Sequence, residues 1–171
     1  TPQPIKQAAI DAMLAGQTRY MPTLGDMPTR EAVAQKLTTE NAIPGLSGNH
    51  IAIGAGGKHA LFTAMHCLLD PPSADGGPAE VLLPVPAWVS YRPIAEMAGG
   101  TVTELPTLPE QDFKITPDQL AAAITPSSRV LVLNSPSNPC GTMYTPDELR
   151  ALAAVVAEKA ASTAPGLVIL S

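Results

Sequence analysis

The stretch NSPSNPCG, which begins at Asn134, places two asparagines and two prolines directly after the apolar run RVLVL. Within it, Asn138 lies between Ser137 and Pro139, and its side-chain amide offers two N–H donors and one carbonyl acceptor. An asparagine in such a place can simply stabilise a turn. Here the prolines restrict the loop and would hold the amide in one position. We therefore expect Asn138 to bind a ligand.

The stretch GAGGK, which ends at Lys58, offers chemistry for an anion. Glycines before a helix allow backbone N–H groups to point at a phosphate, and the helix dipole favours the negative charge. We expect Gly56, Gly57 and Lys58 to lie at such a group, although a plain strand-to-helix turn is the alternative. The stretch matches neither of two better-known phosphate motifs. A P-loop requires Gly where Ala52 stands and Ser or Thr where His59 stands, and a dinucleotide fingerprint requires a third Gly at His59.

Three further side chains could do chemistry. Trp88, the only tryptophan, follows the Pro-rich PVPA stretch and could stack on a planar aromatic ring, with a core position as the alternative. His59 and His66 are seven residues apart, which is about 10 Å along a helix and too far to share a metal ion. Since no acidic cluster joins them, the sequence predicts no metal site.

Helices and strands that must position these residues alternate along the chain. The patterns predict helices over 5–16, 29–41, 58–70, 87–100, 116–124 and 145–160, and strands over 51–53, 80–84, 101–106, 129–134 and 166–170. Thr29 is a candidate N-cap and Gly16 a candidate C-cap. The helix at 58–70 is apolar on most faces and should be buried, and 71–79 should be an exposed turn.

Several of these strands are continuous apolar runs, which is typical of parallel sheets that helices cover on both faces. We therefore expect an α/β fold with a mostly parallel sheet. Ligands of such folds bind beyond the carboxyl ends of the strands. GAGGK, PVPAWVSY, NSPSNPCG and the end of the chain would all lie at that edge.

Composition limits the partners. The net charge is −5 and no basic run is present, which argues against nucleic acid. Apolar stretches stop well short of the roughly 20 residues of a membrane span, and no signal peptide opens the chain. Cys67 and Cys140 show no paired spacing, so we expect a reduced, cytoplasmic setting. Charged residues make up only 15%, which suggests that a partner subunit or another part of the same chain covers much of the surface.

These motifs together resemble the aspartate aminotransferase-like enzymes, which are pyridoxal 5′-phosphate (PLP) proteins of fold type I. NSPSNPCG is similar to the family pattern Asn-Pro-x-Asn-Pro-Thr-Gly, and GAGGKHALF and PAWVSY match two more motifs in the family's order and separation. The resemblance runs from TRYMPTLGDMPTREAVAQKL to GLVILS. It implies that 1–45 are N-terminal helices and an interface loop, and that 46–171 are a PLP-binding large domain, incomplete at its C-terminus.

The resemblance also implies roles for the residues above. The backbone at Gly57 and Lys58, with Gly56 before them, would bind the cofactor phosphate. Trp88 would stack on the pyridine ring. Asn138 would donate a hydrogen bond to the phenolic oxygen O3′, and both Trp88 and Asn138 would lie near the substrate. The substrates implied are an amino acid and a 2-oxo acid.

Tyr20 would reach across a homodimer to the cofactor phosphate of the other subunit. Cys140 replaces the family's threonine. In the family, a strand like GLVILS precedes an aspartate for the ring nitrogen, the Schiff-base lysine and two arginines. We therefore expect this chain to be a large-domain fragment, with no catalytic residue of its own and no activity alone.

Two alternatives stay open at this stage. The same fold also hosts lyases and synthases, so the reaction could differ while the fold is kept. A chain without the Schiff-base lysine could also be a non-catalytic binding or assembly module.

Overall fold

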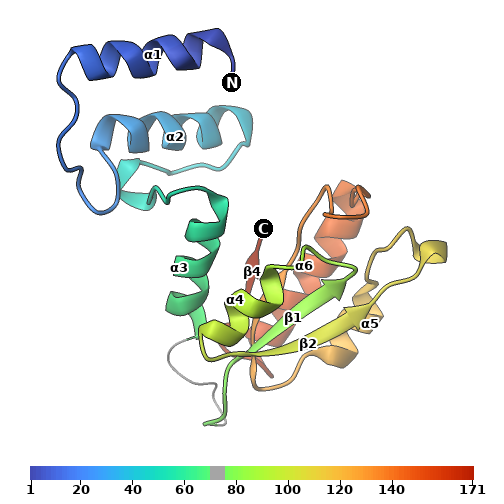
Figure 1. Cartoon of the computed structure of the whole chain (residues 1–171). Helices are drawn as coiled ribbons and strands as arrows, with labels where there is room; N and C mark the ends of the chain where they lie inside the picture. Colours follow the sequence, from blue (N-terminus) through green and yellow to red (C-terminus); the bar gives the residue numbers. More distant parts are fainter. Residues whose placement is uncertain (70–75) are drawn as a thin grey trace. The chain divides into compact units, whose positions relative to one another are not determined.

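The computed structural model describes residues 1–69 and 76–171. The chain divides into two compact units, Thr1–Gly56 and Gly57–Ser171, which are described separately (Figure 1). Most of the exposed turn predicted at 71–79 lies outside the described residues. Within the described residues, no helix combines the length and the hydropathy that crossing a bilayer requires.

The first unit contains the helices α1 (Gln3–Leu14) and α2 (Met27–Glu40) and a short 3₁₀ helix, η1 (Gly48–His50). Gly16, with φ +74°, follows the C-cap of α1 in the left-handed region, which confirms the predicted helix end. The predicted N-cap of α2 is wrong. Asp26 takes that position because its carboxylate accepts a hydrogen bond from the backbone N–H of Thr29 at 3.1 Å.

The apolar run 51–53 is not a strand, contrary to the prediction. Its backbone groups pair within the first unit instead: the N–H of Ile53 donates to the Leu24 carbonyl at 3.0 Å, and the Ile51 carbonyl accepts from Nε of the buried Arg30 at 2.8 Å. Gly25, with φ +93°, permits this approach, because a Cβ there would lie 2.8 Å from Cγ1 of Ile53. Side-chain donors and loop contacts thus replace the ladder that the apolar pattern suggested.

The second unit is built on one four-stranded sheet. Its strands are β1 (Glu80–Val85), β2 (Thr101–Pro106), β3 (Ser128–Val132) and β4 (Val168–Leu170). Their order is β2-β1-β3-β4 and every neighbouring pair is parallel, which confirms the predicted parallel sheet. All four carboxyl ends therefore lie at one edge.

Helices cover both faces of this sheet (Figure 1). The helices are α3 (Gly57–Leu69), α4 (Tyr91–Met97), α5 (Pro117–Ala123) and α6 (Pro146–Ala160), with a 3₁₀ helix η2 (Pro109–Gln111). Leu82 and Leu131 pack with α5 and α6, whereas their strand neighbours Val81 and Val130 pack with α3 and α4. This alternation explains the continuous apolar runs of β1 and β3, because these two central strands bury both of their faces.

Two helix predictions need correction. Only Met65 and Leu69 of α3 are fully buried, because a helix lying on a sheet buries one stripe. Leu61, Phe62 and Leu68 flank that stripe and are partly buried against the same cluster. The helix predicted over 87–100 begins only at Tyr91, so Trp88 lies in the turn before it. Pro93 falls in the first turn of α4, where an N–H has no partner within the helix.

The start of α6 makes stability depend on pH. Glu148 accepts a hydrogen bond from the Thr145 N–H at 2.6 Å, and Nζ of Lys114 lies 3.1 Å from the same carboxylate. The Thr145 N–H first, and Lys114 second, hold the pKa of Glu148 below its ordinary value of 4.5. Because the folded pKa is lowered, this stabilisation is present above pH 4.5 and is lost as the pH falls through the folded pKa.

We therefore expect Glu148→Gln to lower the melting temperature at pH 7, and we expect the gap from the wild type to close in acid. Thermal melts of both proteins across this range measure the effect. A gap that stays constant from pH 7 into acid would contradict it.

Candidate active site

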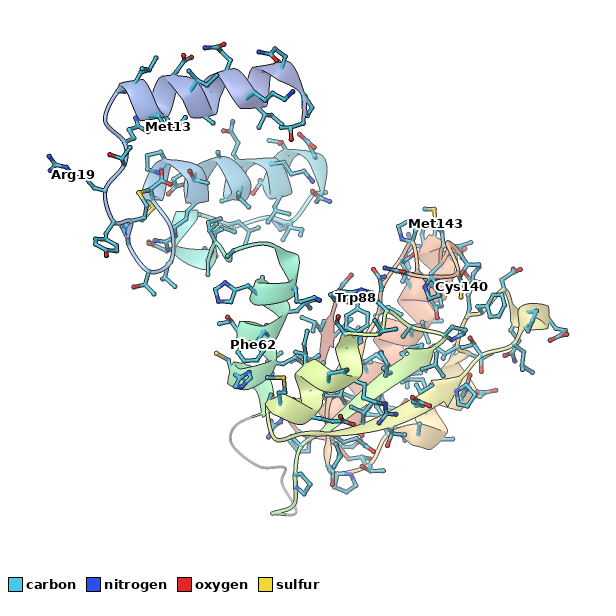
Figure 2. All side chains as sticks on the ribbon, viewed as in Figure 1. Met13, Arg19, Phe62, Trp88, Cys140 and Met143 are labelled. Carbon is cyan, nitrogen blue, oxygen red and sulfur yellow. The ribbon has the colours of Figure 1, made fainter. Side chains whose placement is uncertain are left out.

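The loops after β1 and β3 meet at the carboxyl edge of the sheet. Figure 2 shows Trp88, from the turn after β1, and Cys140, from the loop after β3, at this edge. PVPAWVSY, NSPSNPCG and the end of the chain follow β1, β3 and β4, so these three stretches lie at the edge where the sequence places them. GAGGK differs, because it follows the irregular segment 51–53 and runs directly into α3.

The loop after β3 is held by its own hydrogen bonds. Ser137 donates its N–H to the Thr142 carbonyl, and Gly141 donates to the Ser137 carbonyl, both at 2.8 Å. The Tyr144 N–H donates to Oγ of Ser135 at 3.0 Å. The peptide bonds before Pro136 and Pro139 are cis. None of these contacts uses the side chain of Asn138.

Asn138 is exposed, and its amide makes no hydrogen bond to any residue in 1–69 or 76–171. A turn-stabilising asparagine would bond its side chain to nearby backbone. The amide therefore remains available to a ligand. It borders a pocket at the sheet edge, whose polar and aromatic lining includes Tyr91, Phe113, Asn134, Ser137, Asn138 and Tyr144.

Trp88 is half-buried and has aromatic and cationic neighbours. Its ring lies edge-on to Tyr91, with centroids 5.5 Å apart, and Nζ of Lys58 lies 5.0 Å from its ring centroid. Burial raises the pKa of Tyr91, so its phenol stays neutral at physiological pH. The structure thus brings Lys58 and Trp88 together, although Trp88 does not line the pocket beside Asn138.

The glycine stretch has an open backbone. Gly56 has φ +84°, a conformation that favours glycine, and Gly57 is the first residue of α3. A Cβ built at Gly56 or Gly57 meets no atom within 4 Å. The N–H of Gly56 donates to the Gly54 carbonyl at 2.8 Å, so the N–H groups that can face an anion are those of Gly57 and Lys58, at the start of a 13-residue helix, and the Lys58 side chain is exposed.

Tyr20 belongs to the other unit, Thr1–Gly56, where it lies in the loop between α1 and α2. Its side chain is fully exposed and lines a shallow surface pocket with Thr18 and Arg19. Figure 2 shows the Arg19 side chain extending outward from this loop.

The histidines are not arranged for a metal. The Nδ1 atom of His66 lies 2.9 Å from the Phe62 carbonyl one turn earlier, and the two rings pack with centroids 4.1 Å apart. In the part of the chain that the structure describes, no three His, Cys, Asp or Glu side chains come together as a metal site would require.

Sequence reasoning missed three residues of this edge. Tyr91 packs on Trp88, Asn134 lines the pocket, and the Tyr144 hydroxyl accepts a hydrogen bond from the Ile115 N–H at 2.9 Å. Burial raises the pKa of Tyr144. Two of these residues could have been found from the motifs, because Tyr91 is the last residue of PAWVSY and Asn134 is the first residue of NSPSNPCG. No local pattern marks Tyr144, because its partner is 29 residues away.

Comparison with known proteins gives consistent matches. Residues 1–163 match the family described as aminotransferase class I and II. The chain is 41% identical to the probable aspartate/prephenate aminotransferase of Thermus aquaticus, over 90% of this chain and 38% of that protein. It is also 41% identical to the aspartate aminotransferase of Geobacillus stearothermophilus, over 91% of this chain and 38% of that protein.

Solved structures agree. Aspartate aminotransferase from Thermus thermophilus with maleate superposes with a TM-score of 0.85 at 40% identity, over 92% of this chain and 40% of that one. The enzyme from Rhizobium meliloti gives 0.88 at 34% identity, over 99% of this chain and 39% of that one. The chain thus spans about two fifths of the length of these relatives.

Proposed function

This chain belongs to the class I and II aminotransferase family, and from that premise we propose that the protein containing it transfers amino groups between amino acids and 2-oxo acids with PLP. The observation that carries the proposal is the Asn138 amide. It stands at the carboxyl edge of a parallel sheet and is not used by its own turn. Aspartate is the first donor to test, because the relatives are aspartate and aspartate/prephenate aminotransferases.

The residues of this edge fit PLP, which combines an anionic phosphate, a flat pyridine ring and an ionisable phenol. The N–H groups of Gly57 and Lys58 at the start of α3 suit the phosphate, and no side chain at Gly56 or Gly57 blocks its approach. The Trp88 face, which already attracts the Lys58 ammonium, suits an electron-poor ring. The Asn138 amide can donate to the phenolic oxygen.

In this arrangement each residue has a distinct task. The N–H groups at Gly57 and Lys58 would hold the phosphate, and Trp88 would orient the ring by stacking. Asn138 would donate to O3′, which would favour the ionised phenol and lower its pKa. When bound, PLP supplies an electron-withdrawing ring that stabilises negative charge at the substrate Cα.

An amino-transfer assay of the natural full-length polypeptide tests the proposal. With aspartate, a 2-oxo acid and PLP present, the amino group should appear on the 2-oxo acid, and omission of the acceptor should stop steady-state turnover. Continuous consumption of the amino acid without an acceptor would instead indicate a lyase. No turnover of a panel of amino acids by the PLP-loaded protein would refute the proposal.

Tyr20 is proposed to act across a homodimer, with 1–45 contributing to the subunit interface and 46–171 forming the cofactor domain. Its hydroxyl has no partner among the described residues and is fully exposed. We expect Tyr20→Phe to weaken PLP binding roughly tenfold, because it removes a hydrogen bond to a charged group. Thr23→Val, a hydroxyl removal in the same loop, is the control. Equal PLP affinity in all three proteins would remove Tyr20 from the site.

Mixed dimers separate action across the interface from action within one subunit. When Tyr20→Phe subunits are combined with Asn138→Ala subunits, action in trans leaves one of the two sites with both native residues, so activity returns. Action within one subunit leaves both sites damaged, and mixing restores nothing.

A reduced, cytoplasmic setting is also proposed. It rests on two cysteines, Cys67 and Cys140, that form no disulfide with each other. Cell fractionation with thiol labelling tests it, and an oxidised, exported protein would contradict it.

A further inference from the structure

The carbonyl of Val85, the last residue of β1, accepts two hydrogen bonds from one residue. The N–H of Thr107 donates at 3.0 Å and its Oγ1 donates at 2.8 Å. Val85 lies opposite Pro106 in the parallel register, so the N–H of the next residue, Thr107, makes the regular ladder bond to this carbonyl, and the Thr107 hydroxyl adds a second bond to it. Thr107 is 8% exposed, and this carbonyl is the partner of its hydroxyl.

The same carbonyl begins the turn that presents Trp88. Pro86, which has a restricted φ, follows Val85, and the Trp88 carbonyl accepts from the N–H of Tyr91 at 3.1 Å. The turn is therefore anchored at its start by Thr107 and at its end by α4. The Trp88 ring leaves this turn toward Lys58 and Tyr91.

We propose that Thr107 is a positioning residue, which sets the orientation of Trp88 through the Val85 carbonyl. The purpose of this orientation, which is stacking of Trp88 on PLP, rests on the proposed function. The orientation itself does not depend on PLP and can be measured without it. A purely structural Thr107 would stabilise the end of β2 and leave the Trp88 environment unchanged.

Thr107→Val tests this, because it keeps the shape and removes the hydroxyl. Thr107→Ser, which keeps the hydroxyl, is the rescue variant. Thr103→Val is the matched control: its hydroxyl, earlier on β2, donates to Glu80 at 2.5 Å and does not touch the Trp88 turn. If Thr107→Val does not fold, Thr107→Cys replaces it, because a thiol is a weak donor.

The readout is acrylamide quenching of Trp88 fluorescence in the full-length protein without PLP. Each variant is measured with and without Trp88→Phe, and the difference isolates the signal of this residue. We expect Thr107→Val to change the Trp88 quenching constant and Thr107→Ser to restore the wild-type value. Thr103→Val should lower the melting temperature but leave the Trp88 quenching constant unchanged. In the same series, PLP affinity should fall roughly three- to tenfold for Thr107→Val, the equivalent of one hydrogen bond.

Unchanged quenching in Thr107→Val, with a lower melting temperature, would overturn the proposal and leave Thr107 structural. An equal change in Thr103→Val would also overturn it, since the effect would then be general loosening of β2. If quenching changes as expected but no variant binds PLP, the proposed function fails while the positioning role stands.

Discussion

Replacing Asn138 with alanine is expected to reduce amino-transfer turnover about a hundredfold and to leave the melting temperature unchanged. A hydrogen bond to a charged group contributes roughly 1.5–3 kcal/mol, and the upper part of that range corresponds to two orders of magnitude in rate. Stability should not change, because the turn bonds run through Ser137, Gly141 and Ser135 and the Asn138 amide is exposed.

Ser135→Ala is the matched control for this variant. Its hydroxyl oxygen accepts the Tyr144 N–H, so its loss should lower the melting temperature through the turn alone. Loss of the Asn138 donor should also raise the pH at which the absorbance of bound PLP titrates, because the ionised phenol loses a stabilising partner. An unmoved titration together with a lower melting temperature would make Asn138 a structural residue.

Replacing Leu131 with alanine is expected to lower the free energy of unfolding by roughly 2–5 kcal/mol. Leu131 is 0% exposed on β3, between Leu82 of β1 and Ile169 of β4. Truncation removes buried apolar area and leaves a cavity in a close-packed core. Urea unfolding of the full-length protein measures the change.

Leu108→Ala is the control, since it removes the same atoms from a side chain that is 56% exposed. We expect it to stay within about 0.5 kcal/mol of the wild type. If both variants lose the same free energy of unfolding, Leu131 contributes no more than an exposed leucine, and the prediction that it belongs to the stabilising core is wrong.

The sequence by itself determined the elements of the sheet and the candidate site. Continuous apolar runs marked β1 and β3 because each of these strands buries both of its faces. Thr-Pro-Asp marked the starts of α5 and α6 because caps and first-turn prolines act locally. NSPSNPCG pointed to the edge where the structure places Asn138, because this loop directly follows the carboxyl end of β3 in the chain. Such features depend on residues adjacent in the chain.

The tertiary structure decided what depends on distant residues. The run 51–53 looks like a strand, yet its backbone pairs with Leu24 and Arg30, which no local pattern specifies. One face of α3 stays outward, although its composition suggests burial on most sides. Periodicity reports how apolar a segment is, whereas the packing partner decides which side is covered.

The neighbours of the site residues were likewise beyond the sequence. Lys58 lies over Trp88 across 30 positions of the chain, and Thr107 anchors the Val85 carbonyl across 22. Both contacts arise because the parallel register sets the end of β1 beside the end of β2 and because α3 and α4 share one face. Hydrogen-bond register and helix packing are properties of the assembled sheet, so they appear only once the chain has folded.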